Sequence, residues 1–387
     1  MSIGPSERIR HIQQSEIRNM TRECVRVGGI NLGQGLGDLP TPPQVAQGAI
    51  EAIRAGHSQY SFPEGTAELR EAIAAKLARD NGLEVDPARE IVVTVGSSGA
   101  FAAALMALLD PGDGLLLFEP YYGYHLGAAL LAGLRPEFVS LSPPTFAVDE
   151  SALRAAISPN TRAIVLCTPS NPSGKVMSAD ELCIIERVAT DADLLVITDE
   201  IYEYIVYDGV RHISPATIGS LRERTVSIMG FSKTFSITGW RMGYAVAPPR
   251  LARAINMAND LFYVCAATPL QHGVTAGLQA PRESYAQLAG QYQRKRDIIC
   301  AALREAGMTP IVPKGAYYVL AEIQHLGFTS AKAAAMALLE EVGVASIPGT
   351  AFYQGATGER LLRFCFAKQD DVLHEAGERI RRFRPRP

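Results

Sequence analysis

Cysteine is scarce in this 387-residue chain and clusters of positive charge are few, and these absences exclude several classes of protein. The six cysteines are scattered, with no C-x-x-C spacing and no histidine cluster beside them, which argues against a disulfide framework and a zinc site. The formal net charge is −3, and the one basic cluster is the C-terminal RIRRFRPRP, so little favours a nucleic-acid surface. We therefore expect reduced thiols in a cytoplasmic protein, with no metal site and no nucleic-acid partner.

Long hydrophobic runs and common nucleotide-binding motifs are also missing. The uncharged stretch 91–109 is about long enough to span a bilayer, but its central Gly-Ser-Ser-Gly divides it into a strand and a helix. The polar N-terminus lacks the apolar segment of a secretory signal. No G-K-[ST] follows the Gly/Ser turn, and GQGLG at 33–37 does not match the dinucleotide fingerprint. We therefore expect no membrane partner and neither of these nucleotide sites.

Hydrophobic residues make up 47% of the chain, and their pattern predicts an α/β fold. Leu69, Ile73 and Leu77, spaced at i, i+4 and i+8, predict a helix after Gly65. Short aliphatic runs then alternate with helix-like segments. These runs lie at 91–95, 114–118, 137–141, 163–167, 194–198 and 225–229. Because such runs suit strands buried on both faces, we expect a mostly parallel sheet of the seven-stranded type with flanking helices.

The pattern changes after about residue 280. A long charged helix is predicted there, followed by short strands around AYYVLAEI and RLLRFCFA and by a final helix. We interpret this part as a smaller α+β domain. The expected boundaries are 1–43 for an N-terminal arm and lid segment belonging to the small domain, 44–281 for the large domain and 282–387 for the C-terminal small domain.

Chemically suggestive residues follow several of the aliphatic runs. Ligands of open α/β sheets bind beyond the carboxyl ends of the strands, so these residues can converge on one site. The segment 96–99 begins a helix whose amides favour an anion such as phosphate. Asp199 closes the run at 194–198 with Tyr202 nearby, and Asn171 lies in the Pro- and Gly-rich loop CTPSNPSGKV. Taken one by one, these features also fit a tight turn, a helix N-terminal aspartate and an ordinary loop.

Lys233 lies between an apolar run and a Gly-containing turn in TVSIMGFSKTFSITGWRMGY. Taken alone it would be a solvated surface lysine. A lysine amine, however, condenses with an aldehyde to a Schiff base. Pyridoxal 5′-phosphate (PLP) is the aldehyde cofactor that needs a lysine, a phosphate cradle and a carboxylate for its pyridinium together. Ser232 and Arg241 suit the phosphate, because a guanidinium fork matches phosphate oxygens.

The sequence strongly resembles the class I/II aminotransferases, the fold-type I PLP enzymes, over nearly its whole length. SKTFSITGWRMGY resembles the Schiff-base signature of that family, PSNPSG its N-P-T-G motif and LLRFCFA its R-x-S-F-A motif. The resemblance implies that Lys233 binds the cofactor and that Arg241 holds its phosphate. It also implies that Asn171 lies at the phenolic oxygen of the cofactor and near the substrate carboxylate, which Arg363 grips.

Further motifs imply the remaining site residues. In TDEIY, Asp199 takes the pyridine-nitrogen role and Tyr202 the phenolic-oxygen role, while Tyr122 of EPYYGYH stacks on the pyridine. Tyr60 of QYSFPEGTAELREAI reaches the phosphate of the other subunit, and Gly35 of INLGQGLGDLPTPP lies near the substrate. The expected phosphate cradle comprises Ser97, Ser98, Gly99, Ser232 and Arg241.

Several positions depart from the family pattern. Gly37 replaces the usual lid proline, Cys365 replaces the usual serine, and the phosphate turn reads SSG. The lid sequence QGLGDLPTP resembles that of kynurenine or glutamine aminotransferase relatives more than that of aspartate-specific ones. The segment 255–268, where some aspartate aminotransferases place a cross-subunit arginine, contains no Lys or Arg. Strict specificity for dicarboxylates is therefore not expected.

The resemblance implies a homodimer with shared sites that moves an amino group between an L-amino acid and a 2-oxo acid, with Lys233 also acting as general base. An alternative keeps PLP but performs β-elimination, replacement or cyclisation of a modified amino acid in a biosynthetic pathway. A ligand-sensing transcription factor on this fold would need a helix-turn-helix, for which we see no room before the lid segment. The sequence names neither the amino donor nor the acceptor.

Overall fold

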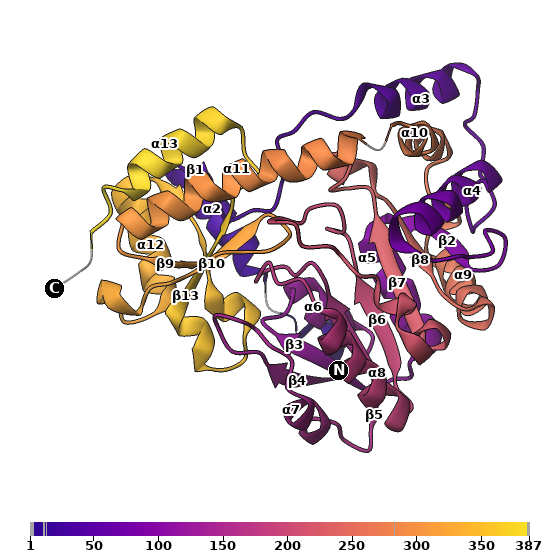
Figure 1. The fold of residues 1–387 in the computed structure, drawn as a ribbon, viewed down its shortest axis with the longest axis horizontal. Coiled ribbons are helices and arrows are strands. Elements are labelled where there is room, and N and C mark those ends of the chain that lie inside the picture. Colours follow the sequence, from indigo (N-terminus) through magenta and orange to yellow (C-terminus); the bar gives the residue numbers. More distant parts are fainter. Residues whose placement is uncertain (1–3, 11, 13, 282, 385–387) are drawn as a thin grey trace.

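The computed structural model describes residues 4–10, 12, 14–281 and 283–384, so the last three residues of the basic C-terminal segment lie outside it. Two sheets organise the chain (Figure 1). The larger is built from residues between 91 and 246, and the smaller from residues between 309 and 365. The long helix α11 (Glu283–Glu305) runs from the neighbourhood of α10 (Thr268–Leu278) to the smaller sheet.

The larger sheet has seven strands and is mostly parallel, as the sequence predicts. In spatial order the strands are β2 (Ile91–Val95), β8 (Met242–Val246), β7 (Thr225–Gly230), β6 (Leu195–Asp199), β5 (Thr161–Cys167), β3 (Gly114–Glu119) and β4 (Arg135–Ser140). Only β8 is antiparallel to its neighbours in this sheet. The six aliphatic runs all became strands, whereas β8 was not predicted.

Helices cover both faces of this sheet, because successive strand residues point to opposite sides. Leu115 and Leu117 of β3 pack in one apolar cluster and Leu116 in another. The first cluster includes residues of α5 (Gly96–Leu108), α6 (Gly123–Leu131) and α9 (Pro249–Tyr263). The second includes residues of α8 (Ala179–Asp191). The α5 helix begins at the Gly-Ser-Ser-Gly segment, which therefore forms its first turn rather than a separate loop.

The helix predicted after Gly65 is α4 (Ala67–Lys76). The hydroxyl of Thr66 accepts a hydrogen bond from the amide of Leu69 at 3.3 Å, which satisfies one free donor at the helix N-terminus. Leu69 and Ile73 are fully buried, as is Leu77, which begins the π-helical turn Leu77–Asn81. The predicted apolar stripe thus packs against the edge of the sheet at β2 and β8.

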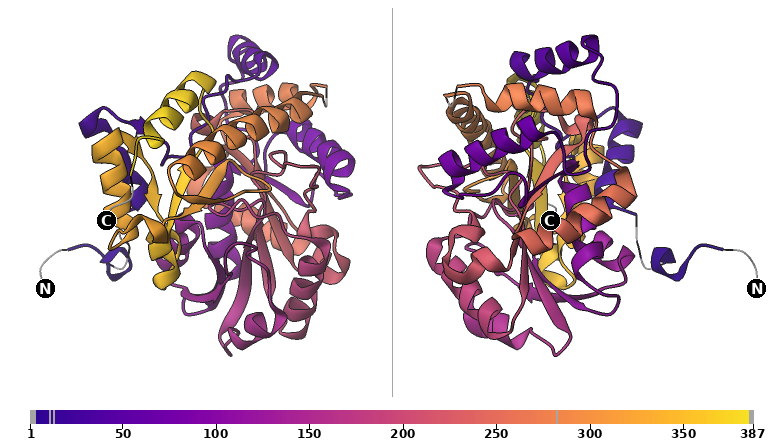
Figure 2. Two further views of the ribbon diagram at one scale, coloured as in Figure 1. Left: turned by 60° about the vertical axis from the view of Figure 1, so that its left-hand side comes forward. Right: turned by 90° about the vertical axis from the view of Figure 1, so that its right-hand side faces the viewer.

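The smaller sheet has four antiparallel strands in the order β12 (Ile347–Pro348), β13 (Leu361–Cys365), β10 (Tyr318–Glu322) and β9 (Thr309–Ile311). A separate parallel pair joins β1 (Ile30–Asn31) to β11 (Val344–Ala345), so the N-terminal segment packs with C-terminal residues. The remaining helices are α1 (Glu7–Arg10), α2 (Glu16–Val27), α3 (Pro43–Arg54), α7 (Glu150–Ala155), α12 (Ala331–Val342) and α13 (Asp370–Ile380). The right-hand view of Figure 2 shows α1 at the periphery of the molecule, and α1 contacts α6.

The carboxyl ends of β5, β6 and β7 face the smaller sheet. Arg363 of β13 donates to Asn171, which follows β5, at 2.9 Å, and the amide of Tyr121 donates to the carbonyl of Phe352 at 3.0 Å. The sequence-predicted site residues therefore lie where the two sheets meet. Among the described helices, none has both the length and the apolar character needed to cross a bilayer.

Candidate active site

Asp199 and His125 form a buried pair at the end of β6. The Oδ2 atom of Asp199 lies 3.0 Å from Nε2 of His125, and Oδ1 accepts a hydrogen bond from the amide of Ile201 at 3.2 Å. In the tautomer that carries a proton on Nε2, His125 donates to this carboxylate. The imidazole is held by the ring of Phe101, whose centroid is 4.6 Å away. The pair thus presents a fixed carboxylate at this strand end.

Lys233 follows β7 and reaches the same space. Its Nζ atom donates to the carbonyl of Gly35 at 3.1 Å and lies 6.0 Å from the ring centroid of Tyr202. Burial lowers the pKa of this amine to about 8, although the charges of Cys365 and Asp199 act in the opposite direction. The amine is therefore neutral at a much lower pH than an ordinary lysine, which makes it a better nucleophile and base near neutrality.

The N-terminus of α5 and Arg241 form a cluster of hydrogen-bond donors. Nη2 of Arg241 donates to the hydroxyl of Ser98 at 2.8 Å. A Cβ atom on Gly96, whose φ is +72°, would lie 2.6 Å from the same Nη2, so this approach requires glycine. Arg241 itself has a φ of +59°, a strained conformation for a non-glycine residue that is often found at functional sites. Ser232, which directly precedes Lys233 in the chain, is also buried.

Arg363 is almost completely buried and has no carboxylate partner among the described residues. Its Nη1 donates to Oδ1 of Asn171 at 2.9 Å and its Nη2 to the carbonyl of Gly33. The guanidinium lies between the rings of Tyr318 and Phe352, with centroids 4.4 and 4.7 Å away. The Nε atom has no hydrogen-bond partner. Since an unpaired buried donor is costly, this arrangement is typical of a site that receives an anion.

Tyr202 and Gly35 meet a group of tyrosines beside Lys233. The hydroxyls of Tyr202 and Tyr318 are 3.1 Å apart, and Tyr317 donates to the carbonyl of Gly35 at 3.0 Å. Burial raises the pKa of Tyr202 well above its ordinary value, so it remains a phenol that can donate. A Cβ atom on Gly35 would lie 1.8 Å from the hydroxyl oxygen of Tyr318, so no other residue fits there without movement.

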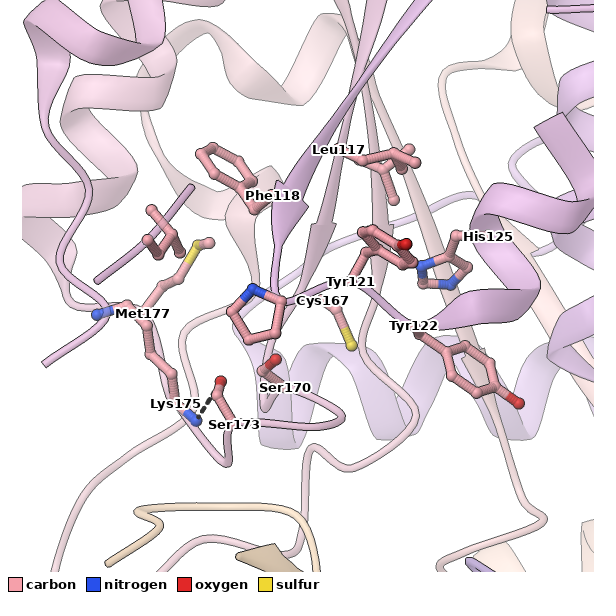
Figure 3. A pocket seen from close by; sticks show the side chains of 13 residues that line it. Leu117, Phe118, Tyr121, Tyr122, His125, Cys167, Ser170, Ser173, Lys175 and Met177 are labelled. Carbon is pink, nitrogen blue, oxygen red and sulfur yellow. Dashed lines mark hydrogen bonds between the residues drawn. The ribbon is translucent and has the colours of Figure 1, made fainter. Parts of the chain in front are cut away.

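Tyr122 lies on the other side of the Asp199 pair. Its ring meets that of His125 edge-on at 5.3 Å, and Figure 3 shows both side chains on the same side of a small cavity. This cavity, about 30 Å³, is also lined by Cys167 and Ser170 and has room for a water molecule but not for a substrate. The candidate site is therefore the space between the two sheets and not this cavity.

Tyr60 is the one sequence-predicted site residue that the structure leaves apart from the others. Its side chain is 81% exposed. Its role at the site of a second subunit stays a prediction. Lys233, Asp199, Tyr202, Asn171, Gly35 and Arg363 lie together, as the contacts above show. Ser97, Ser98 and Gly99 form the first turn of α5 beside Arg241.

Sequence reasoning missed His125, Tyr317, Tyr318 and Phe352. His125 lies in EPYYGYH, the motif used to choose Tyr122, and a histidine in so apolar a segment was a usable signal. The other three give no local signal, because their relevance comes from packing against Arg363 and Gly35. Within the described ranges, no group of three or more His, Cys, Asp or Glu residues is arranged to bind a metal.

Comparison with known proteins agrees with this geometry. The pattern of the family described as aminotransferase class I and II matches residues 27–380. The chain is 38% identical to a probable N-succinyldiaminopimelate aminotransferase, DapC, of Mycobacterium tuberculosis, over 98% of each chain. It is 34% identical to the methionine aminotransferase of Escherichia coli, over 91% of each.

Solved structures give the same result. The N-succinyldiaminopimelate aminotransferase of M. tuberculosis superposes with a TM-score of 0.95, covering 98% of this chain and 99% of that one at 38% identity. An aspartate aminotransferase of Thermus thermophilus with maleate gives a TM-score of 0.92 at 32% identity, covering 98% and 100%. These relatives share the fold over their whole length and differ in the amino acid that their names give.

The family match over most of the chain, with these full-length relatives and the fold-type I architecture, supports one conclusion. This chain belongs to the class I and II aminotransferases, the PLP-dependent enzymes that transfer an amino group between an amino acid and a 2-oxo acid.

Proposed function

We propose that this aminotransferase holds PLP between the N-terminus of α5 and the carboxyl ends of β6 and β7, with Lys233 as its covalent anchor. One observation carries the proposal. The amine of Lys233 is neutral above about pH 8, lies within the electrostatic influence of Asp199 and Arg241, and has no carboxylate partner within the described part of the chain. An amine in that state is prepared to bond to an aldehyde.

The donors at α5 fit a phosphate group. The amides of Ser97, Ser98 and Gly99 belong to the first turn of the helix, where backbone N–H groups lack intrahelical acceptors. Arg241 adds a guanidinium directly beside Ser98. This donor set is electropositive and lies on the same side of the sheet ends as Lys233. We therefore assign the phosphate to these four residues and to Ser232.

The Asp199–His125 pair fits the pyridine nitrogen. Asp199 is buried and hydrogen-bonded to His125, and a carboxylate at this position would pair with a protonated ring nitrogen. Tyr122 would cover one face of that ring, and the phenol of Tyr202 would donate to its oxygen. Asn171, whose Nδ2 takes no part in the contact with Arg363, would donate to the same oxygen.

Bound PLP supplies an aldehyde carbon that receives the amino group and a ring that withdraws electrons from the substrate. The residues of this chain orient the amino acid and move its proton. Arg363 binds the α-carboxylate through its unused Nε and the Nη groups, and Asn171 fixes the plane of that guanidinium. Lys233 Nζ then accepts the proton from Cα, as its lowered pKa allows.

We further propose that two chains form a homodimer with shared sites. Exposed apolar side chains gather on one face: Tyr60, Phe62, Met257, Leu261, Phe262, Tyr263 and Val264. The two segments that carry them are joined, since Thr268 Oγ1 donates to the carbonyl of Gln59 at 2.7 Å and Gln271 Nε2 to Ser61 Oγ at 2.9 Å. Tyr263 also lies beside Gly99. An apolar patch of this kind next to the phosphate donors supports a second chain bringing its own Tyr60.

We also propose that the large and small domains of this chain meet at residues 43 and 281. Residues 30–31 pair with residues 344–345, which ties the N-terminal segment to the part after 281.

A cytoplasmic location is supported by the six cysteines, all of which are free. The names of the relatives disagree on the amino acid, so the proposed substrates are an L-amino acid and a 2-oxo acid without further assignment.

The experiment is a half-reaction. Purified protein reconstituted with PLP is mixed with single L-amino acids, and the absorbance of the bound cofactor and the release of a 2-oxo acid are followed. The proposal expects stoichiometric 2-oxo acid without ammonia for at least one amino acid. Release of ammonia, or no spectral change with any amino acid, would contradict it.

A further inference from the structure

Glu119 is a buried carboxylate at the end of β3 that forms no ion pair with any described residue. Its side chain is 4% exposed, and two neutral donors hold it. The hydroxyl of Ser140, beside it at the end of β4, donates to Oε2. The backbone amide of Gln354 donates to Oε1. Because a buried carboxylate is costly without such donors, both hydrogen bonds are needed to keep this side chain in place.

The second donor comes from a distant part of the chain. Gln354 follows the short 3-10 helix Gly349–Phe352, which packs against β13 and α12 beside the smaller sheet. Two further hydrogen bonds join the same segments. The amide of Tyr121 donates to the carbonyl of Phe352 at 3.0 Å, and Nε2 of Gln354 donates to the hydroxyl of Tyr121 at 2.6 Å. We call Glu119, Tyr121, Phe352 and Gln354 the clasp, because they join the end of β3 to the smaller sheet.

The clasp lies next to two parts of the proposed site. Tyr121 directly precedes Tyr122, which would cover one face of the cofactor ring. On the other side, the fully buried ring of Phe352 packs on Arg363, with its centroid 4.7 Å from the guanidinium carbon. Arg363 has no carboxylate partner among the described residues, so aromatic packing and neutral hydrogen bonds orient it. A shift of the Phe352 ring would therefore move the guanidinium on which it packs.

We propose that Glu119 is a positioning residue for the substrate carboxylate: from the end of β3 it holds residues 352–354, and through Phe352 it fixes the guanidinium of Arg363 relative to the cofactor site. This inference rests on the proposed function, because it takes Arg363 as the α-carboxylate site. Glu119 itself touches neither substrate nor cofactor. Its acceptor oxygens matter more than its charge, since both of its partners are neutral donors.

Steady-state kinetics of the holoenzyme tests this role, with the L-amino acid that the half-reaction converts fastest. Glu119→Ala should raise KM about tenfold and lower kcat by about threefold at most, because a hydrogen bond to a charged group is lost while the reacting groups remain. Glu119→Gln should keep KM within about threefold of the wild type, since its amide oxygen still accepts from Gln354. Ser140→Ala, the matched control, removes the other donor to the same carboxylate and should leave KM unchanged.

Hydrogen–deuterium exchange of the cofactor-free protein measures the clasp without the reaction. In Glu119→Ala, a peptide that contains residues 349–355 should exchange about tenfold faster, while a peptide from the core of the larger sheet, such as 163–167, should be unchanged. A merely destabilised protein would exchange faster in both peptides. Gln354→Ala alters an exposed side chain and keeps the amide that binds Glu119, so KM should rise only about two- to threefold through one lost neutral hydrogen bond.

An unchanged KM in Glu119→Ala would overturn the inference, as would an equal rise in Ser140→Ala or in Glu119→Gln. Unaltered exchange of residues 349–355 would do so as well. If Glu119→Ala does not fold, an unchanged KM in Gln354→Ala is the contradicting result. Failure of the proposed function looks different, because the wild type would then convert no amino acid, whereas the exchange of residues 349–355 would still respond to the variants.

Discussion

A buried and a partly buried lysine of this protein, Lys76 and Lys233, have opposite surroundings. Lys76, the last residue of α4, is 1% exposed and makes an ion pair with Glu203 at 2.5 Å, while the hydroxyl of Tyr244 lies 3.3 Å from its amine. Lys233 makes a single hydrogen bond to a neutral carbonyl, that of Gly35, within the described residues. The first amine is bound to a carboxylate, whereas burial lowers the pKa of the second to about 8.

The difference shows what a reactive lysine requires. A carboxylate at hydrogen-bond distance would keep Lys233 protonated and occupied. The nearest carboxylate in the site, Asp199, is instead bound to His125. The Lys76–Glu203 pair has another role, because Glu203 directly follows Tyr202 and also accepts from Asn81 at 2.9 Å. The pair stabilises the turn that carries Tyr202, whereas Lys233 takes part in the reaction.

The largest effect is expected from removing the reactive lysine. Lys233→Ala should lower the rate of amino transfer by about 10²–10⁴-fold, because the general base is lost, while PLP still binds without a covalent bond. Single-turnover kinetics with PLP-loaded protein measures this. Lys314→Ala, which removes an exposed lysine, is the matched control. If Lys233→Ala transferred amino groups at a rate close to that of the wild type, Lys233 would not be the reactive lysine of this protein.

The structural lysine should affect stability instead. Lys76→Met leaves the carboxylate of Glu203 buried and unpaired, so the free energy of unfolding should fall by about 3–5 kcal/mol. The double variant Lys76→Met with Glu203→Leu should recover most of that loss, because both charges are gone. Urea denaturation of the three proteins measures it. Equal stability of the single variant and the wild type would show that the pair does not stabilise the fold.

Arg363 extends the comparison to a guanidinium that also lacks a carboxylate partner. Arg363→Lys should raise KM for the amino acid about 10- to 100-fold while cofactor binding stays near normal, because an ammonium cannot replace the planar fork. Arg296→Lys is the matched control, since Arg296 is buried but already paired with Asp208 at 2.8 Å. Steady-state kinetics should therefore show a raised KM for Arg363→Lys and an unchanged KM for Arg296→Lys. An unchanged KM in Arg363→Lys would mean that the substrate α-carboxylate binds elsewhere.

The last prediction of this comparison concerns pH, which changes the state of Lys233 without removing a side chain. A lowered pKa means that Lys233 loses its proton near pH 8 rather than near the ordinary 10.5. The rate at which cofactor-free protein bonds to added PLP should therefore rise about tenfold per pH unit below 8 and level off above it, because only the neutral amine reacts. Stopped-flow absorbance between pH 6 and 10 records the profile. A rate that keeps rising to pH 10 would show an ordinary lysine.

Much of this fold follows from local sequence, because strands buried on both faces appear as uninterrupted aliphatic runs. The strand β8 was missed, since its residues MGYAV continue directly from the motif around Lys233 and were read only as part of it. Its antiparallel pairing with β2 and β7 depends on contacts that no local pattern records. Asn171, Asp199 and Lys233 were found because they follow aliphatic runs that form strands. Tyr60 and Arg363 were found only through the family resemblance.

What the sequence could not supply are contacts between distant segments. The bond from Lys233 to Gly35 joins residues 198 positions apart, and that from Arg363 to Asn171 joins residues 192 apart. The Lys76–Glu203 pair is similar: nothing near Lys76 in the sequence distinguishes it from a solvated helix-end lysine. Burial and partner together decide what a lysine does, and both are properties of the folded chain.

The most direct test of the two-lysine account is reductive trapping. The PLP-loaded protein is treated with borohydride, digested and mapped by mass spectrometry. The account predicts the pyridoxyl mass on Lys233 alone, with Lys76 unmodified, and no trapped cofactor in Lys233→Ala. The mass on Lys76 or on any other lysine of the wild-type protein would contradict it.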